Sequence, residues 1–175
     1  YSFEENVKRT KEIVDYAHLR GVVVEAELGL VGEGEEYDDQ ESNNNIYTTA
    51  AEAKAFVEAT GVDSLAISIG TAHGSYKAAA TPVIDFDRLK EIAATIDTPL
   101  VLHGGSSSGD ENLNKCATNG ISKVNIYTDL CVAAYNKAQE TDCKNYHEMK
   151  SAMKAGMQEC LEHYYEVFET KKFND

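Results

Sequence analysis

Two histidines in this 175-residue sequence each follow an apolar segment and each precede a glycine. His73 lies in AISIGTAHGSY, and His103 lies in PLVLHGGSSSG. Imidazole is a common zinc ligand, and a neighbouring glycine lets the backbone approach a bound group closely. One histidine at a strand end more often has a structural role, whereas two on neighbouring strands favour a metal site. A catalytic zinc site usually has three protein ligands, so a third ligand must come from elsewhere.

The residues after the second histidine form another candidate site. Gly104, Gly105 and Ser106 lead toward a predicted helix start, where backbone N–H groups and the helix dipole favour an anion. The segment KVNIYTD, residues 123–129, offers a second anion contact through the backbone and hydroxyl of Thr128. Each segment alone also fits an ordinary Gly/Ser loop or helix N-cap, so both interpretations stay open at this point.

Alternating strands and helices position these residues. The predicted strands cover residues 21–28, 64–70, 100–104 and 122–128. Helices precede, separate and follow these strands; Asp85 and Asp110 are predicted N-caps, and the last helix covers residues 145–170. This order predicts an α/β fold of four parallel strands with crossover helices.

Polar residues stand at the carboxyl end of each predicted strand. Parallel strands bring these ends to one edge of the sheet, where α/β folds bind ligands. The residues concerned are Glu27, His73, His103, Asn125 and Thr128. We therefore expect a binding site at this edge. The remaining histidines lie on predicted helices away from it and are expected to be surface or packing residues: His18, His147 and His163.

Composition excludes several classes of protein. Lys and Arg total 16 against 30 Asp and Glu, and the net charge of −14 argues against nucleic-acid binding. No apolar run approaches the length of a membrane span. The four cysteines show no CxxC spacing, which indicates the free thiols of a cytoplasmic protein.

Four segments together resemble the class II, metal-dependent aldolases that act on fructose- or tagatose-bisphosphate. They are VEAELG, VDSLAISIGTAHGSY, TPLVLHGGSS and KVNIYTDL, and they occur in the family's order and at fitting spacing. The resemblance covers nearly the whole chain. It implies a TIM (β/α)8 barrel with zinc at its C-terminal rim, in an enzyme of carbohydrate metabolism such as glycolysis.

The resemblance also implies a role for individual residues. His73 and His103 match two of the three zinc-binding histidines, and Glu27 matches a second or displaced metal position. The positions that match phosphate-contacting residues are Gly74, Gly104, Gly105, Ser106, Asn125, Ile126, Tyr127 and Thr128. The family's first zinc histidine and its proton-transfer aspartate lie on an earlier strand, so no catalytic acid or base is assigned within this chain.

The activity implied is cleavage of a ketose 1,6-bisphosphate to dihydroxyacetone phosphate and an aldehyde. The aldehyde is glyceraldehyde 3-phosphate if the ketose is fructose-bisphosphate. Fructose-bisphosphate members tend to carry an arginine before the last helix, whereas residues 141–150 here read TDCKNYHEMK. The resemblance therefore leaves the ketose open.

A complete barrel has eight strands and about 250 residues. We therefore expect residues 1–175 to form a single domain equivalent to strands five to eight, the C-terminal half of a barrel. Such a half is expected to be nearly inactive alone, and to form homo-oligomers or associate with the missing N-terminal half. A non-catalytic or split aldolase half that keeps only phosphate binding and assembly is the alternative. Another zinc lyase or sugar-phosphate isomerase on the same barrel is a third.

Overall fold

Four parallel strands form the main sheet of the protein. The computed structural model describes residues 1–30, 32–33, 47–73 and 82–173. The strands are β1 (Glu25–Leu28), β3 (Ser64–Ile67), β5 (Leu100–Leu102) and β6 (Ile121–Val124), and they lie side by side in chain order. Two short strands, β2 (Gly32–Glu33) and β4 (Ala72–His73), form a separate parallel pair. The predicted α/β fold of four parallel strands is confirmed, although the strands are shorter than expected.

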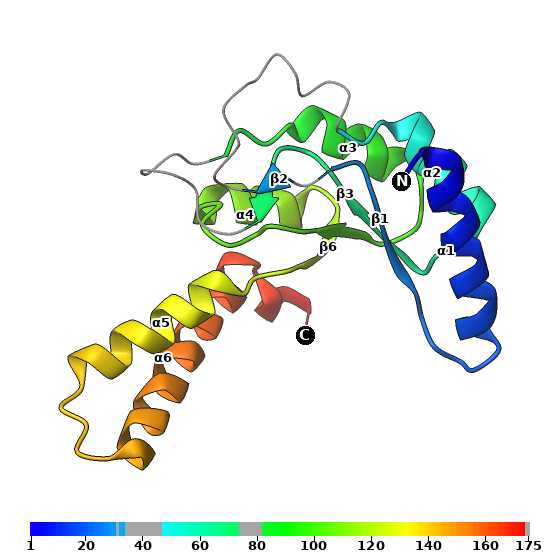
Figure 1. Ribbon diagram of the computed structural model, residues 1–175. Coiled ribbons are helices and arrows are strands. Elements are labelled where there is room, and N and C mark those ends of the chain that lie inside the picture. Colours follow the sequence, from blue (N-terminus) through cyan, green and yellow to red (C-terminus); the bar gives the residue numbers. More distant parts are fainter. Residues whose placement is uncertain (31, 34–46, 74–81, 174–175) are drawn as a thin grey trace.

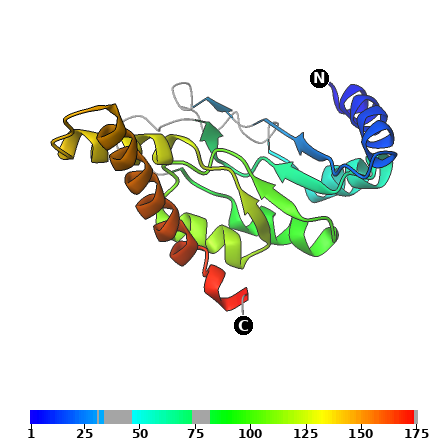
Figure 2. The same ribbon diagram turned by 90° about the horizontal axis from the view of Figure 1, so that it is seen from below.

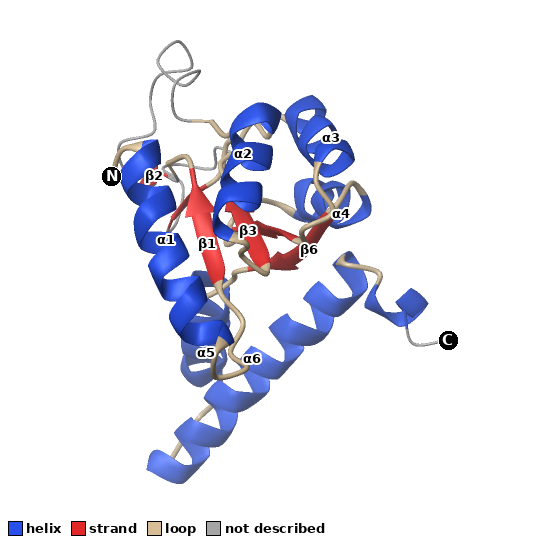
Figure 3. Ribbon diagram, turned by 90° about the vertical axis from the view of Figure 1, so that its right-hand side faces the viewer, coloured by secondary structure: helices blue, strands red, loops and turns tan. Residues whose placement is uncertain are grey.

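The helices between these strands line up along one face of the sheet. In chain order they are α1 (Phe3–His18), α2 (Ala50–Thr60), α3 (Phe86–Thr95) and α4 (Asp110–Thr118), and each contacts the next. Figure 3 shows this row beside the strands. Two further helices, α5 (Thr128–Glu140) and α6 (Tyr146–Val167), form a hairpin that projects away from the sheet and ends in a short 3-10 turn, Thr170–Phe173 (Figure 1).

Most helix starts follow the predicted capping residues. Asp85 accepts from the backbone N–H of Arg88 at 2.9 Å at the start of α3. The prediction for Asp110 is wrong, because Gly109 occupies the N-cap position of α4 and no side chain caps that helix. Gly109 has φ +82°, a left-handed conformation that glycine adopts readily, so the chain turns into the helix one residue earlier than expected. The carboxylate of Asp110 instead pairs with His163 at 3.0 Å.

The hydrophobic core lies between the sheet and the row of helices. On the central strands its buried members are Leu65, Ile67, Leu100 and Leu102, and on the edge strands they include Leu28 and Ile121. On the helices they include Phe56, Leu89, Ile92 and Leu113. Because side chains alternate along a strand, the residues between these leucines and isoleucines point to the opposite face of the sheet.

Strand register identifies which side chains share that opposite face. Glu27 of β1 is paired with Ala66 of β3, Ala66 with Val101 of β5, and Val101 with Lys123 of β6. Residues paired directly across parallel strands lie on the same face. One row of the sheet therefore carries two small or medium apolar side chains at its centre and two charged side chains at its edges.

The helical hairpin depends on close contact between its two helices. A Cβ on Gly156 of α6 would lie only 2.4 Å from the carbonyl oxygen of Ala133 in α5. Lys137 and Glu159 form an ion pair across the same interface at 2.6 Å. Figure 2 shows α5 and α6 meeting at an angle beside the sheet. Glycine is thus required at position 156 for close packing.

All four cysteines are free thiols, as expected. Cys116 lies in the core, and burial raises the pKa of its thiol to about 12. No helix in the described ranges has both the length and the apolar character that crossing a membrane requires.

We predict that Gly156→Ala destabilises the protein. The added methyl group would overlap the α5 backbone, and overpacking of this kind costs about 1–3 kcal/mol. Urea denaturation would measure the loss, with Ser151→Ala on the exposed side of α6 as the control. Equal stability of Gly156→Ala and the wild type would contradict this account of the hairpin.

Candidate active site

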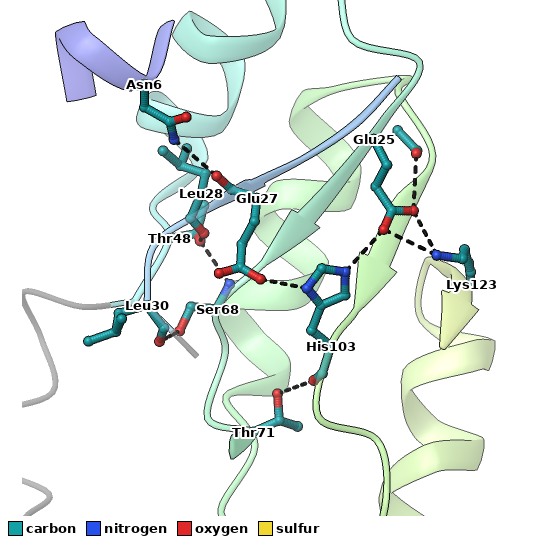
Figure 4. Close-up of polar contacts among 11 residues, drawn as sticks. Asn6, Glu25, Glu27, Leu28, Leu30, Thr48, Ser68, Thr71, His103 and Lys123 are labelled. Carbon is teal, nitrogen blue, oxygen red and sulfur yellow. Dashed lines mark hydrogen bonds and ion pairs between the residues drawn. The ribbon is translucent and has the colours of Figure 1, made fainter. Parts of the chain in front are cut away.

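An imidazole and two carboxylates meet on the face of the sheet opposite the helices. His103 directly follows β5; its Nδ1 lies 2.5 Å from Oε2 of Glu27, and its Nε2 lies 3.0 Å from Oε1 of Glu25 (Figure 4). The two glutamates are two residues apart on β1, so both point to this face. The intervening strand β3 presents two small side chains there, Ala66 and Ser64, and the Ser64 hydroxyl donates to Glu25 at 3.4 Å, which leaves room for the larger side chains to meet.

Lys123 completes this cluster from the other edge of the sheet. Its Nζ lies 2.9 Å and 3.1 Å from the two carboxylate oxygens of Glu25. Glu25 is on β1 and Lys123 is on β6, and these are the edge strands of the sheet. In a flat sheet three strand spacings would separate them by roughly 14 Å. Their contact fits a sheet that curls toward this face and makes it concave, as in a barrel.

The cluster is partly shielded from water. The side chain of His103 is 16% exposed and that of Glu25 is 27% exposed. Burial acts to raise the pKa of Glu25, but hydrogen bonds from Lys123 and His103 outweigh it and lower that pKa below its ordinary value. Glu25 is therefore ionised at neutral pH.

The second carboxylate of the cluster has a different environment. Among the residues that the structure describes, no Lys or Arg pairs with Glu27, although its backbone carbonyl accepts from the side-chain amide of Asn6 at 3.0 Å. Glu27 thus points an oxygen at His103 with no lysine or arginine beside it.

The chain segment that carries His73 lies against the segment that carries His103. Thr71 Oγ1 donates to the carbonyl oxygen of His103 at 2.7 Å. A Cβ on Gly104 would come within 2.5 Å of the carbonyl oxygen of Ala72, and Gly104 has φ +68°. The glycine after His103 is therefore required by close contact with the backbone just before His73.

The structure places His73 in β4, paired with Glu33 of β2, rather than at the end of β3. The side chain of His73 and all of Gly74 lie outside the described residues. The prediction that His73 and His103 bind one cation therefore stays a prediction.

The predicted phosphate-binding segments are brought together. Gly105 N–H donates to the carbonyl oxygen of Asn125 at 3.1 Å, and Ser106 Oγ accepts from the backbone N–H groups of Tyr127 and Thr128, each at 3.1 Å. The helix α5 begins at Thr128, as predicted, but a hydroxyl from a distant loop caps it. Ile126, also in the predicted set, packs partly buried against the core. Three amides predicted to bind phosphate thus have partners within the chain.

Asp129 fixes the loop that follows His103. Its carboxylate accepts from Ser107 N–H at 2.9 Å, from Ser107 Oγ at 3.2 Å and from the hydroxyl of Tyr164 at 2.5 Å. Ser107 has φ +60°, a left-handed conformation that costs energy in a residue with a Cβ. Burial and the hydrogen bond to Asp129 raise the pKa of Tyr164, so its hydroxyl stays protonated. The last helix thereby holds the loop that follows His103.

Sequence reasoning missed four residues of this region. Glu25 had a usable signal, since it alternates with Glu27 on one strand. Lys123 could be placed in a strand from the sequence, but its contact with Glu25 depends on the curl of the sheet and has no local signal. Asp129 and Tyr164 are joined by tertiary packing alone. The other histidines behave as expected: His18 pairs with Asp63 at 2.8 Å, His163 pairs with Asp110, and His147 is exposed.

Comparison with known families identifies the chain. The family model described as Fructose-bisphosphate aldolase class-II matches residues 1–172. The chain belongs to this family. Its described residues contain no group of three or more His, Cys, Asp or Glu side chains arranged to hold a metal ion. Within that part, His103 and Glu27 are two adjacent candidate donors.

Solved aldolase structures share the fold. The YdjI aldolase from Escherichia coli K12 matches with a TM-score of 0.80 and 33% identity, over 96% of this chain and 57% of that one. A putative fructose-1,6-biphosphate aldolase from Coccidioides immitis matches with a TM-score of 0.76 and 30% identity, over 97% and 60%. Fructose-bisphosphate aldolase from Campylobacter jejuni, 23% identical, matches in fold with a TM-score of 0.75, over 96% and 57%.

These neighbours are TIM-barrel aldolases, and this chain spans between 57% and 60% of their length. Membership of the class II aldolase family thus explains why this chain forms four parallel strands with helices between them. The sheet described here corresponds to part of such a barrel, and its concave face corresponds to the barrel interior.

We predict that Asp129→Asn loosens the loop at residues 104–108. The amide replaces a charged acceptor of three hydrogen bonds, and a hydrogen bond to a charged group contributes about 1.5–3 kcal/mol. Hydrogen exchange of the loop amides should become faster and the free energy of unfolding should fall. Asp142→Asn, which removes an exposed ion pair with Lys144, is the matched control. Unchanged exchange in the loop would refute the role given to Asp129.

Proposed function

We propose that this chain provides part of the active site of a metal-dependent aldolase. The reaction is reversible cleavage of a ketose 1,6-bisphosphate to dihydroxyacetone phosphate and an aldehyde. The observation that carries the proposal is the contact between His103 and Glu27 on the concave face, in a chain of the class II aldolase family. The ketose is fructose- or tagatose-bisphosphate, or a related sugar, and in the first case the aldehyde is glyceraldehyde 3-phosphate.

The donor atoms at this place fit zinc. Imidazole nitrogen and carboxylate oxygen both bind zinc at about 2.0–2.2 Å. The 2.5 Å contact between His103 and Glu27 is too short to hold an ion between them, so the two side chains must rotate apart, by about 1 Å for a tetrahedral ion. Partial exposure of both side chains permits that rotation.

His103, Glu27 and His73 are the residues of this chain that we propose to hold zinc, Glu27 at a second or displaced position. Bound zinc supplies positive charge that polarises a ketone oxygen and stabilises an enediolate. Zinc would bind both imidazoles in their neutral form. The proton-transfer aspartate of the family has no match in this chain.

The loop at residues 104–108 and the start of α5 are proposed to bind the phosphate of the ketose. Gly74, Gly104 and the segment 125–128 complete this set. The amides of Tyr127 and Thr128 now donate to Ser106 Oγ, so phosphate binding requires that this hydroxyl release them. The released hydroxyl can then itself donate to phosphate. Two amides at a helix N-terminus suit an anion despite the net charge of −14.

We further propose that residues 1–175 form one domain equivalent to barrel strands five to eight. The edge strands β1 and β6 each have one neighbour in the described main sheet. Open edges of a curled sheet favour further strand pairing. The chain is therefore proposed to associate with strands equivalent to the first half of a barrel, or with a second copy of itself, and to have little activity without them.

The cellular setting is part of the same proposal. The four free thiols are compatible with a reducing compartment, and the family's place in carbohydrate metabolism suits the cytoplasm. Nucleic acid is not a proposed partner, because the charge balance of 16 basic against 30 acidic residues opposes it.

A coupled assay of triose phosphate release tests the activity. The protein purified in its native assembly should release triose phosphate from fructose- or tagatose-bisphosphate. A chelator should abolish the release and zinc should restore it, and His103→Ala should lower the rate at least about 100-fold because a metal ligand is lost. Exposed His147→Ala is the matched control and should keep the wild-type rate.

The same preparation distinguishes the alternative. Phosphate binding that survives both the chelator and His103→Ala, together with no lyase activity, would support a non-catalytic aldolase half. That result would overturn the proposed activity.

A further inference from the structure

We propose that Glu25, anchored by Lys123, is a positioning residue that holds the ring of His103 by its Nε2 and so directs Nδ1 toward Glu27. The inference rests on the proposed function only for the identity of the ion, because the contacts among Lys123, Glu25 and His103 are present in the structure. Figure 4 shows the imidazole lying between the two carboxylates, with the lysine on the far side of Glu25.

The ion pair between Glu25 and Lys123 differs from the others in the chain. Among the described residues, most of the other ion pairs of Lys or Arg, such as Glu5–Arg9 and Lys11–Asp15, join residues three or four positions apart on one helix. Glu25 and Lys123 are 98 residues apart and join the two edge strands of the sheet. Exposed pairs within a helix contribute little. A pair that spans the concave face instead fixes where the Glu25 carboxylate lies.

A neutral imidazole has one N–H group and one lone pair. Lys123 anchors the Glu25 carboxylate at 2.9 Å, so this carboxylate has a fixed position from which to accept the Nε2–H. Nε2–H donates to Glu25 at 3.0 Å, and the 2.5 Å contact of Nδ1 with Glu27 is itself a hydrogen bond that needs a shared proton. A bound cation would replace that proton and take the Nδ1 lone pair of the neutral ring. Among the described residues Glu27 lacks a Lys or Arg partner, so the side of the ring facing Glu27 is the place for an added cation.

This arrangement resembles the general pattern in which a carboxylate accepts from one nitrogen of a histidine while the other nitrogen binds a metal. Such a carboxylate fixes the ring orientation and the position of the proton. Removing it typically weakens metal binding 10–100-fold. The inference therefore assigns opposite roles to two glutamates that are only two residues apart.

Lys123→Met tests the inference without altering the histidine or either glutamate. Methionine keeps the length of the side chain and removes its charge, and the side chain of Lys123 is 53% exposed, so the fold should persist. Glu25→Gln is the second variant, and circular dichroism verifies the fold of both. Lys11→Met, which removes an exposed pair with Asp15 on α1, is the matched control.

The first measurement is the position of the ring proton. Protein labelled with nitrogen-15 in its histidines is measured by NMR at about pH 8.5, where histidine is normally neutral. In the wild type and in Lys11→Met, Nε2 of His103 should carry the proton. In Lys123→Met and Glu25→Gln the two tautomers should mix. Unchanged His103 signals in both variants, or an unprotonated Nε2 in the wild type, would overturn the inference.

The second measurement is zinc binding by calorimetry. The Lys123→Met protein should bind zinc at least about 10-fold more weakly than the wild type does. If the wild type binds no zinc while the tautomers still mix in Lys123→Met, the positioning role stands and the zinc part of the proposed function fails. If zinc binds equally to both proteins and the His103 signals are unchanged, the positioning role is overturned while the proposed function stands.

Discussion

The curl of the four-stranded sheet is the constraint on which the rest of the site depends. Helices cover one face, and the opposite face closes enough for the edge strands to touch through Glu25 and Lys123. Parallel strands twist relative to one another, and a twisted sheet with helices on one side curls away from them. Small side chains at the centre of the row, Ala66 and Val101, leave room for the larger side chains that cover them. The charged groups at the edges then converge on His103.

Close backbone contact is the second constraint. Gly104 lies against the backbone of Ala72, and Gly105 leaves no room for a Cβ beside Val124 and Asn125. The loop after His103 is thereby packed between the loop before His73 and the start of α5. Ser106 and Asp129 fix it by hydrogen bonds from opposite sides of the helix start. The residues proposed to bind a cation and those proposed to bind an anion thus lie in one connected piece of structure.

Much of this could be predicted from the sequence because it follows local rules. Strand–helix alternation predicts parallel strands, and the capping residues predict most helix starts. His103 was found because a histidine that ends an apolar run and precedes two glycines is distinctive. The prediction that Asp110 caps α4 was wrong, because Gly109 occupies the N-cap position. Glu27 was found as a polar residue at a strand end, and only its metal position came from the family resemblance.

Other parts depend on tertiary geometry that no local pattern carries. Lys123 meets Glu25 only because the sheet curls, and the sequence distance between them gives no hint of it. Tyr164 reaches Asp129 because the hairpin folds back at a spacing that Gly156 permits. The Ser106 hydroxyl caps α5, whereas the anion contact predicted at this residue was its backbone N–H. Each of these contacts joins residues more than twenty positions apart.

The concave face is proposed to be a metal-binding surface organised around His103. Crystals of the protein soaked in zinc, measured at the zinc absorption edge, test this most directly. We predict an anomalous difference peak within bonding distance of His103 Nδ1 and a Glu27 oxygen, with Glu25 still hydrogen-bonded to Nε2. Zinc bound only at surface carboxylates, with the His103–Glu27 contact undisturbed, would contradict it.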